Sequence, residues 1–110
     1  MAEFSDFQQL DLRIGTILTA EPFSKARVPA FKITIDFGTE IGIKKSSAQI
    51  THRYQPEDLV GKQVTAVVNF PPRNIAGFSS EVLILGAVPG EGDVVLLHPD
   101  EAVPNGTIIS

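Results

Sequence analysis

The chain has 110 residues, 43% of them hydrophobic, which is enough for one domain with a substantial core. It contains no cysteine, which excludes disulfides, thiolate metal ligands and a cysteine nucleophile. The formal net charge of -4 argues at first sight against a polyanionic partner, because phosphate contacts supply most of the affinity of proteins for nucleic acids.

The N-terminal residues do not have the pattern of a secretory signal. Glu3 and Asp6 stand where such a signal carries basic and then apolar residues. No apolar run in the chain approaches the roughly 18 residues of a membrane span. We therefore expect neither a signal peptide nor a transmembrane helix, and the lack of cysteine favours the cytoplasm.

A short helix and a long strand are expected first. Ser5, followed three residues later by Gln8, has the form of a capping box and predicts a helix over 6–10. Apolar and polar residues then alternate with period two. The face that we expect to be buried comprises Leu12, Ile14, Thr16 and Leu18, and the wetter face comprises Arg13, Gly15, Ile17 and Thr19.

A hairpin is expected next, after a loop over 21–29. Residues 31–37 alternate most regularly, which places Phe31 and Phe37 in the core. A turn over 38–40 leads to a second strand over 41–45. Residues 48–54 are compatible with a helical turn, and the Pro and Gly that bound 56–61 predict a short helix.

The remaining strands are expected over 64–70 and 82–88, with shorter ones over 94–97 and within 105–109. Five strands with a helical link between the third and fourth predict an all-β OB-fold barrel over 11–88. A helix over 1–10 and a β extension over 89–110 then lie outside the barrel. Their apolar residues would be exposed on a monomer, which predicts a homodimer.

The charge is distributed unevenly along the chain. All nine Lys and Arg residues lie at or before Arg73, and five acids but no base follow it. Between Arg13 and Arg53 there are seven bases and three acids, a balance of 7 − 3 = +4. This asymmetry fits a basic face on an acidic body, and it also fits a chance distribution of surface charges.

Catalytic and metal-binding patterns are absent from the sequence. There is no G-x-S-x-G elbow, P-loop or G-x-G-x-x-G motif. His52 and His98 stand in polar surroundings and are expected at the surface, so a metal site would need carboxylates from scattered positions. We therefore expect a non-enzymatic protein without a cofactor.

Several motifs follow one another in a fixed order. They are LDLRIG (10–15), KKSSAQI (44–50), PEDLVGK (56–62), VVNFPP (67–72) and IAGFSSEVL (75–83). In this order the chain resembles the tRNA-binding domain that occurs in the tail of some aminoacyl-tRNA synthetases and in their accessory proteins. Within that family, the segments 46–48, 67–73 and 92–107 are similar to a short, stand-alone branch of export-related chaperones.

The resemblance implies an OB-fold and a homodimer built from the N-terminal helix and the C-terminal extension. It also implies tRNA as a partner and, for the stand-alone branch, chaperone-like binding of unfolded preproteins in protein export. Because an OB-fold binds nucleic acid on its second and third strands and the flanking loops, we expect the RNA site there. The candidate RNA-binding residues are Lys25, Arg27, Lys32, Lys44, Lys45, Ser47, Asn69, Arg73 and Ser80.

Other roles are open for some residues of these motifs. Arg13 stands near Asp11, which favours an internal ion pair over RNA contact. Asn69 is equally suited to satisfying backbone groups in a turn. Ile75 and Phe78 are candidates for an apolar groove that binds peptide.

Three functions follow from these expectations. The first is a dimeric tRNA-binding module, for which the scarcity of stacking aromatics favours recognition of a folded RNA by shape and backbone. The second is an export chaperone that binds extended apolar peptides and whose RNA binding is incidental. The third is a basic-faced dimer that docks an acidic protein.

Overall fold

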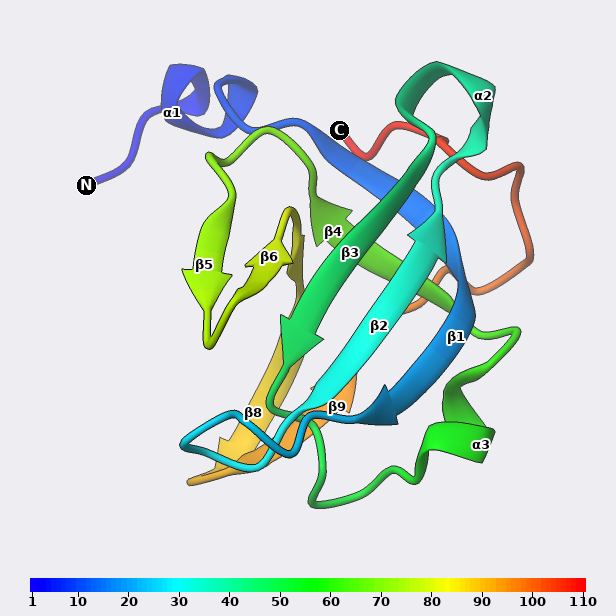
Figure 1. Cartoon of the computed structure of the whole chain (residues 1–110). Helices are drawn as coiled ribbons and strands as arrows, with labels where there is room; N and C mark the ends of the chain where they lie inside the picture. The colour runs from blue at the N-terminus through cyan, green and yellow to red at the C-terminus, as the bar shows by residue number, and fades with distance from the viewer.

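The structure is organised around a curved antiparallel sheet in the order β3-β2-β1-β4-β7, as Figure 1 shows for the computed structural model, which describes residues 1–110. The strands are β1 (Leu12–Pro22), β2 (Phe31–Asp36), β3 (Ile43–Ala48), β4 (Gln63–Val67) and β7 (Leu83–Ile84). The sheet closes on itself just before β7, where the Glu81 N–H donates to the Lys45 carbonyl of β3 at 2.8 Å. The predicted all-β class and OB-fold barrel are confirmed.

Two hairpins and three short helices surround the barrel. The hairpins are β5 (Arg73–Ile75) with β6 (Phe78–Ser80), and β8 (Gly86–Gly90) with β9 (Asp93–Leu96). The helices are α1 (Phe4–Gln8), α2 (Gly38–Ile41) and α3 (Pro56–Leu59). None of these helices has the length and apolar character that crossing a bilayer requires.

The core lies inside the barrel and is made of the inward-facing residues of its strands. Ile33, Ile35 and Phe37 are fully buried, as the alternation of 31–37 predicts. The helix α3 links β3 to β4, as expected, and covers one end of the barrel (Figure 1), where its Leu59 is also fully buried.

The predicted faces of β1 are wrong beyond Thr16. The pairing of β1 with β2 shifts register between Ile17 and Thr19, which marks a β-bulge. Ile17 precedes the bulge and pairs with the buried Ile35, so it is 1% exposed and belongs to the core, whereas Leu18 is 40% exposed. The alternation of the sequence does not tell which of the two faces of a strand meets the core, and it cannot reveal a bulge, which reverses the side of every later residue.

Several other predicted elements differ from the structure. Residues 38–41 form the helix α2 instead of a turn and the start of a strand, and the single strand expected over 82–88 is divided into β7 and β8. The N-terminal helix covers 4–8 rather than 6–10, and Glu3 and Asp6 form its capping box. Strand β3 extends to Ala48, so the expected helical turn over 48–54 is reduced to a turn over 51–53. The C-terminal strand within 105–109 is a single β-bridge between Arg13 and Ile108.

Gly15 marks the closest approach of β1 to the core side chains. A Cβ atom at this position would lie 2.6 Å from Ile35 Cγ2 and 2.7 Å from Phe37 Cδ1. We expect Gly15→Ala to lower the free energy of unfolding by about 1–3 kcal/mol in urea titrations, because both side chains must move. Gly90→Ala is the control, since no atom lies within 4 Å of the place that its added methyl group would take. Equal stability of the two variants would contradict this packing.

Candidate nucleic-acid interface

Strands β2 and β3 carry basic and polar side chains on the face that points away from the core. Lys32 lies opposite Ser47 in the strand register, and Thr34 lies opposite Lys45. Their sequence neighbours Phe31 and Ile33 are buried, so the four polar side chains occupy the outer face. The alternation that builds the core therefore also builds this surface.

The hairpin β5–β6 lies beside β3 and forms the second wall of a groove. Its Ser80 Oγ accepts a hydrogen bond from the Ser47 N–H at 3.0 Å. Residues of this hairpin line three adjoining hollows of about 290, 270 and 310 Å³. We call the surface around them the basic groove, and its residues are Lys25, Arg27, Lys32, Lys45, Ser47, Arg73, Ile75, Phe78 and Ser80.

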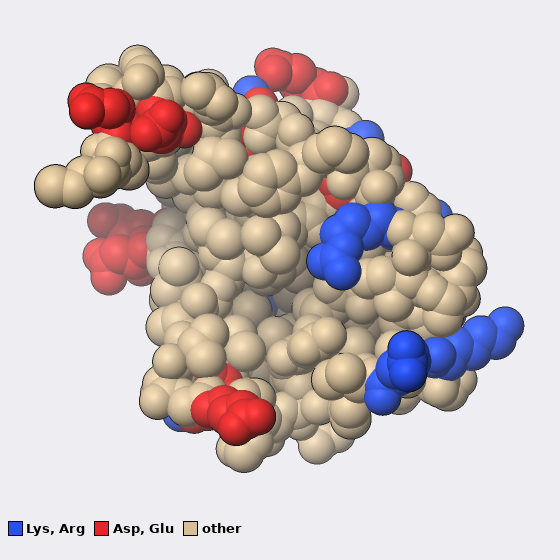
Figure 2. All heavy atoms as spheres, turned by 90° about the vertical axis from the view of Figure 1, so that its left-hand side faces the viewer, with Lys and Arg blue, Asp and Glu red and all other residues tan.

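Figure 2 shows the face that carries β5 and β6. Lys and Arg side chains gather along the right-hand margin, several acids lie on the left and at the top, and uncharged, hollowed surface fills the middle. Within the groove, Lys32 forms an ion pair with Glu21 at 3.2 Å. The exposed side chains of Lys25, Arg27, Lys45 and Arg73 form no ion pair. The groove thus presents four bases without an ion pair, and one acid, Glu81, whose Oε1 accepts a hydrogen bond from the Lys45 N–H at 2.9 Å, on a protein of net charge -4.

Two of the nine candidate RNA-binding residues lie apart from the groove. Lys44 faces the side of β3 opposite to Lys45, in register with the buried Ile35. The amide of Asn69 is held by the backbone: its Oδ1 accepts from the Asp11 N–H and its Nδ2 donates to the Gln9 carbonyl, both at 2.9 Å. This is the backbone role that the sequence left open for Asn69, and it ties β4 to the segment between α1 and β1.

Arg13 forms the internal ion pair that its sequence position predicts. Its Nε lies 2.6 Å from Asp11 Oδ1, its Nη1 donates to the Gly106 carbonyl at 3.1 Å, and its side chain is only 12% exposed. The hydrogen bond to Asp11 raises the pKa of the guanidinium. Arg13 therefore joins β1 to the C-terminal segment.

An ion pair between Arg53 and Asp93 offsets the positive charge of another base. Arg53 Nη2 lies 2.8 Å from Asp93 Oδ2. The hydrogen bond holds the pKa of Asp93 below its usual range and raises the pKa of Arg53.

Sequence reasoning missed Phe23, which is 6% exposed within the segment predicted as a loop. Its ring packs edge-on against Phe78, with 5.4 Å between ring centroids. Phe78 and Ile75 are both half-buried, and each lines one or more of the hollows. No pattern around Phe23 signals this contact, because the two rings are separated by most of the barrel sequence.

The tip of the β5–β6 hairpin is strained. Ala76 has a φ of +49° and Gly77 a φ of +84°, the pattern of a type I′ turn, in which asparagine is preferred to alanine. We expect Ala76→Asn to raise the free energy of unfolding by about 0.5–1 kcal/mol, measured by thermal unfolding. The control Ala87→Asn, in strand β8, should give no gain. A loss at Ala76 would argue against the left-handed turn.

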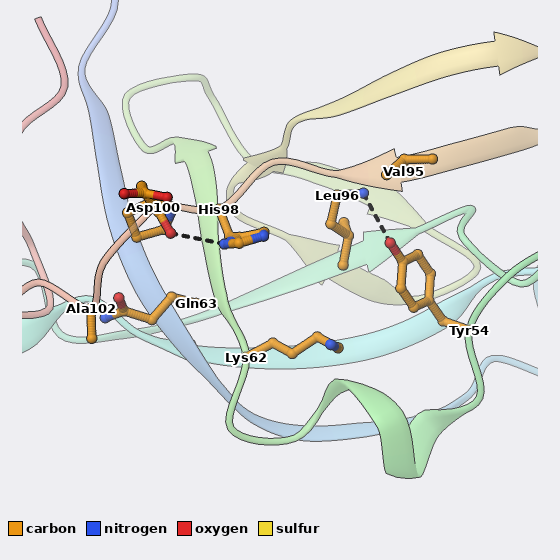
Figure 3. A pocket seen from close by; sticks show the side chains of 9 residues that line it. Tyr54, Lys62, Gln63, Val95, Leu96, His98, Asp100 and Ala102 are labelled. Atoms are coloured by element: carbon orange, nitrogen blue, oxygen red, sulfur yellow. Dashed lines mark hydrogen bonds between the residues drawn. The ribbon is translucent and has the colours of Figure 1, made fainter.

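A larger cavity of about 490 Å³ lies outside the basic groove (Figure 3). Its polar groups are largely engaged by the chain itself: the Tyr54 hydroxyl accepts from the Leu96 N–H at 3.1 Å, and Gln63 Nε2 donates to the Val103 carbonyl at 2.7 Å. His98 is exposed, as expected, with Nδ1 2.8 Å from the Pro99 carbonyl oxygen. None of the candidate RNA-binding residues lines this cavity, and no three His, Asp or Glu residues come together anywhere as a metal site.

The comparisons with known proteins agree on one family. The family described as "Putative tRNA binding domain" matches residues 12–108. The chain is 34% identical over 110 residues to the methionine–tRNA ligase of Flavobacterium johnsoniae and 40% identical over 106 residues, 96% of the chain, to that of Bacteroides fragilis. It spans only 15% of the length of each ligase.

Two solved structures match over their full length. The CsaA chaperone from Bacillus anthracis is 65% identical with a TM-score of 0.96, covering 100% of this chain and 99% of that one. The CsaA chaperone protein from Picrophilus torridus is 48% identical with a TM-score of 0.93, covering 100% of both chains. The predicted resemblance to the family and to its stand-alone chaperone branch is confirmed.

Proposed function

The chain belongs to the putative tRNA-binding domain family, and on that premise we propose that it is a non-catalytic protein that binds tRNA in the basic groove. The observation that carries the proposal is the set of four exposed, unpaired bases around the β5–β6 hairpin. Each can neutralise a phosphate, and Ser47 and Ser80 add hydroxyl groups that can bind sugar or phosphate.

A folded RNA suits this groove better than a flexible single strand. Single-strand binders stack successive bases on exposed aromatic rings. Here Phe23 is buried, Phe78 is half-buried against it, and the Tyr54 hydroxyl is hydrogen-bonded to the β9 backbone. Phe70, which is 43% exposed beside one hollow, is a single ring and gives no row of stacking surfaces, which favours recognition through the shape and backbone of a structured RNA.

We further propose that the protein acts as a homodimer. The helix α1 and the C-terminus lie at the same end of the molecule (Figure 1). Apolar side chains at this end are exposed: Phe4 by 72%, Phe70 by 43% and Ile108 by 64%. Isologous pairing through this end would remove them from water.

A second candidate function is binding of unfolded preproteins during protein export in the cytoplasm. It is favoured by the two CsaA chaperones among the similar structures. The apolar lining of one hollow, which includes Phe70, Ile75 and Leu83, suits an extended peptide. Docking of an acidic protein on the same bases is the third candidate.

Titration of labelled tRNA across a salt series, with an unfolded polypeptide as competitor, tests these functions. With four phosphate contacts, the logarithm of the affinity should fall with the logarithm of salt concentration with a slope of about -3 to -4. Absence of tRNA binding at low salt would overturn the proposal. Binding of the polypeptide with little salt dependence, in place of tRNA, would favour the chaperone function alone. Sedimentation at micromolar concentration tests the dimer.

A further inference from the structure

Phe78 occupies the centre of a small cluster in the basic groove. The Lys45 Nζ lies 5.4 Å from the centroid of its ring, and the Lys32 Nζ lies 5.8 Å from the same centroid. The Phe23 ring packs edge-on against the Phe78 ring, with 5.4 Å between their centroids. The Lys32 Nζ also lies 5.6 Å from the centroid of the Phe23 ring. Two ammonium groups from neighbouring strands thus share one aromatic ring, which attracts each of them through its quadrupole.

The hairpin brings the ring to this place. Phe78 opens β6 and pairs with Ile75 across the two-residue turn of Ala76 and Gly77. Because the hairpin lies beside β3, the ring projects toward the lysines on the outer face of β2 and β3.

A base cannot use this ring as an open stacking surface while the ring holds two lysines and one aromatic edge. The structure instead assigns Phe78 a positioning role, an inference that rests on the proposed function: it holds Lys32 and Lys45 ready for the sugar–phosphate backbone of a folded RNA. A lysine side chain loses much rotamer freedom when it binds a phosphate. A lysine that is already held in place loses less rotamer freedom when it binds a phosphate, so the affinity for RNA rises without any added charge.

The two lysines depend on Phe78 to different degrees. Lys32 is also held by Glu21 at 3.2 Å and by Phe23. Lys45 has no ion pair, and Phe78 is the only ring on which its ammonium lies. Loss of the ring should therefore free Lys45 more than Lys32.

Affinity for tRNA in the full-length protein tests the role. Phe78→Leu should weaken binding about three- to tenfold, whereas Phe78→Tyr, which keeps the ring, should bind within about twofold of the wild type. The salt slope should not change, because every base is still present. In a variant that already carries Lys32→Gln and Lys45→Gln, Phe78→Leu should lower the affinity for tRNA by less than about twofold, because the two lysines that the ring positions are absent.

If Phe78→Leu lowers the affinity for tRNA as much in the double-glutamine variant as in the wild type, the positioning role is overturned. A loss confined to unstructured single-stranded RNA, with tRNA binding intact, would show that the ring stacks on bases and would also overturn it. Phe78→Tyr, which keeps the ring, is the reference for both outcomes.

Proton NMR of the free protein separates this inference from the proposed function. The ε-methylene signals of Lys45 should be shifted upfield by the ring current in the wild type and in Phe78→Tyr, and unshifted in Phe78→Leu. Unshifted signals in a wild-type protein that binds tRNA would overturn the positioning role alone. Shifted signals in a wild-type protein that binds no tRNA would overturn the proposed function.

Discussion

Replacing Lys45 and Arg73 together with glutamate is expected to weaken tRNA binding roughly 10- to 100-fold at moderate salt. Both side chains are exposed and without an ion pair, one on β3 and the other on the β5–β6 hairpin that faces it. Each substitution removes one phosphate contact and places a negative charge where the RNA backbone would lie. The salt slope should also become shallower by about 2, since two fewer counterions are released.

The matched control reverses two charges outside the groove. Lys44 adjoins Lys45 in the sequence but faces the other side of β3, and Lys62 lines the cavity of Figure 3. Lys44→Glu with Lys62→Glu changes the net charge by the same amount, so only the general electrostatic attraction should weaken, by a few-fold. Equal losses in the two double variants would show that net charge, rather than the basic groove, governs binding.

Phe37→Ala is expected to lower the free energy of unfolding by about 3–5 kcal/mol, the largest loss of stability that we predict for a single substitution. The ring is fully buried and packs where Gly15 brings β1 close. Its removal leaves a cavity that the surrounding strands cannot fill, because the Phe37 N–H is fixed to the Gly42 carbonyl at 3.0 Å. A loss of this size is a large share of the roughly 5–15 kcal/mol typical of small domains.

Urea unfolding at fixed protein concentration measures this loss, and Leu18→Ala supplies the comparison. Leu18 is 40% exposed, on the side of β1 opposite to the buried Ile17, so its truncation should lower the free energy of unfolding by well under about 1.5 kcal/mol. A larger loss at Leu18 than at Phe37 would place Leu18 in the core and would contradict the observed register.

The sequence predicts the barrel because its strands alternate where one face is buried. Residues 31–37 are the clearest case, with every second side chain in the core. The same rule, extended to residues 41–48, would have separated Lys44 from Lys45, since adjacent strand residues point to opposite faces. Grouping the two lysines by their charge alone misses this difference.

Other features depend on contacts between distant segments and leave no local pattern. The bulge after Ile17 is set by pairing with β2. The β5–β6 hairpin has three residues in each strand and no alternation of apolar side chains, so the Pro and Gly residues around it suggest only a loop. The contact between Phe23 and Phe78 exists only once that hairpin lies beside β3.

Ultraviolet crosslinking of bound tRNA, followed by mapping of the crosslinked peptides, tests the central claim most directly. If RNA binds in the basic groove, crosslinks should concentrate in residues 23–32, 45–47 and 73–80, and Lys45→Glu with Arg73→Glu should remove most of them. The region around Lys62 and His98 should stay free of crosslinks. Crosslinks concentrated in that region, with few in the groove, would contradict the proposed site.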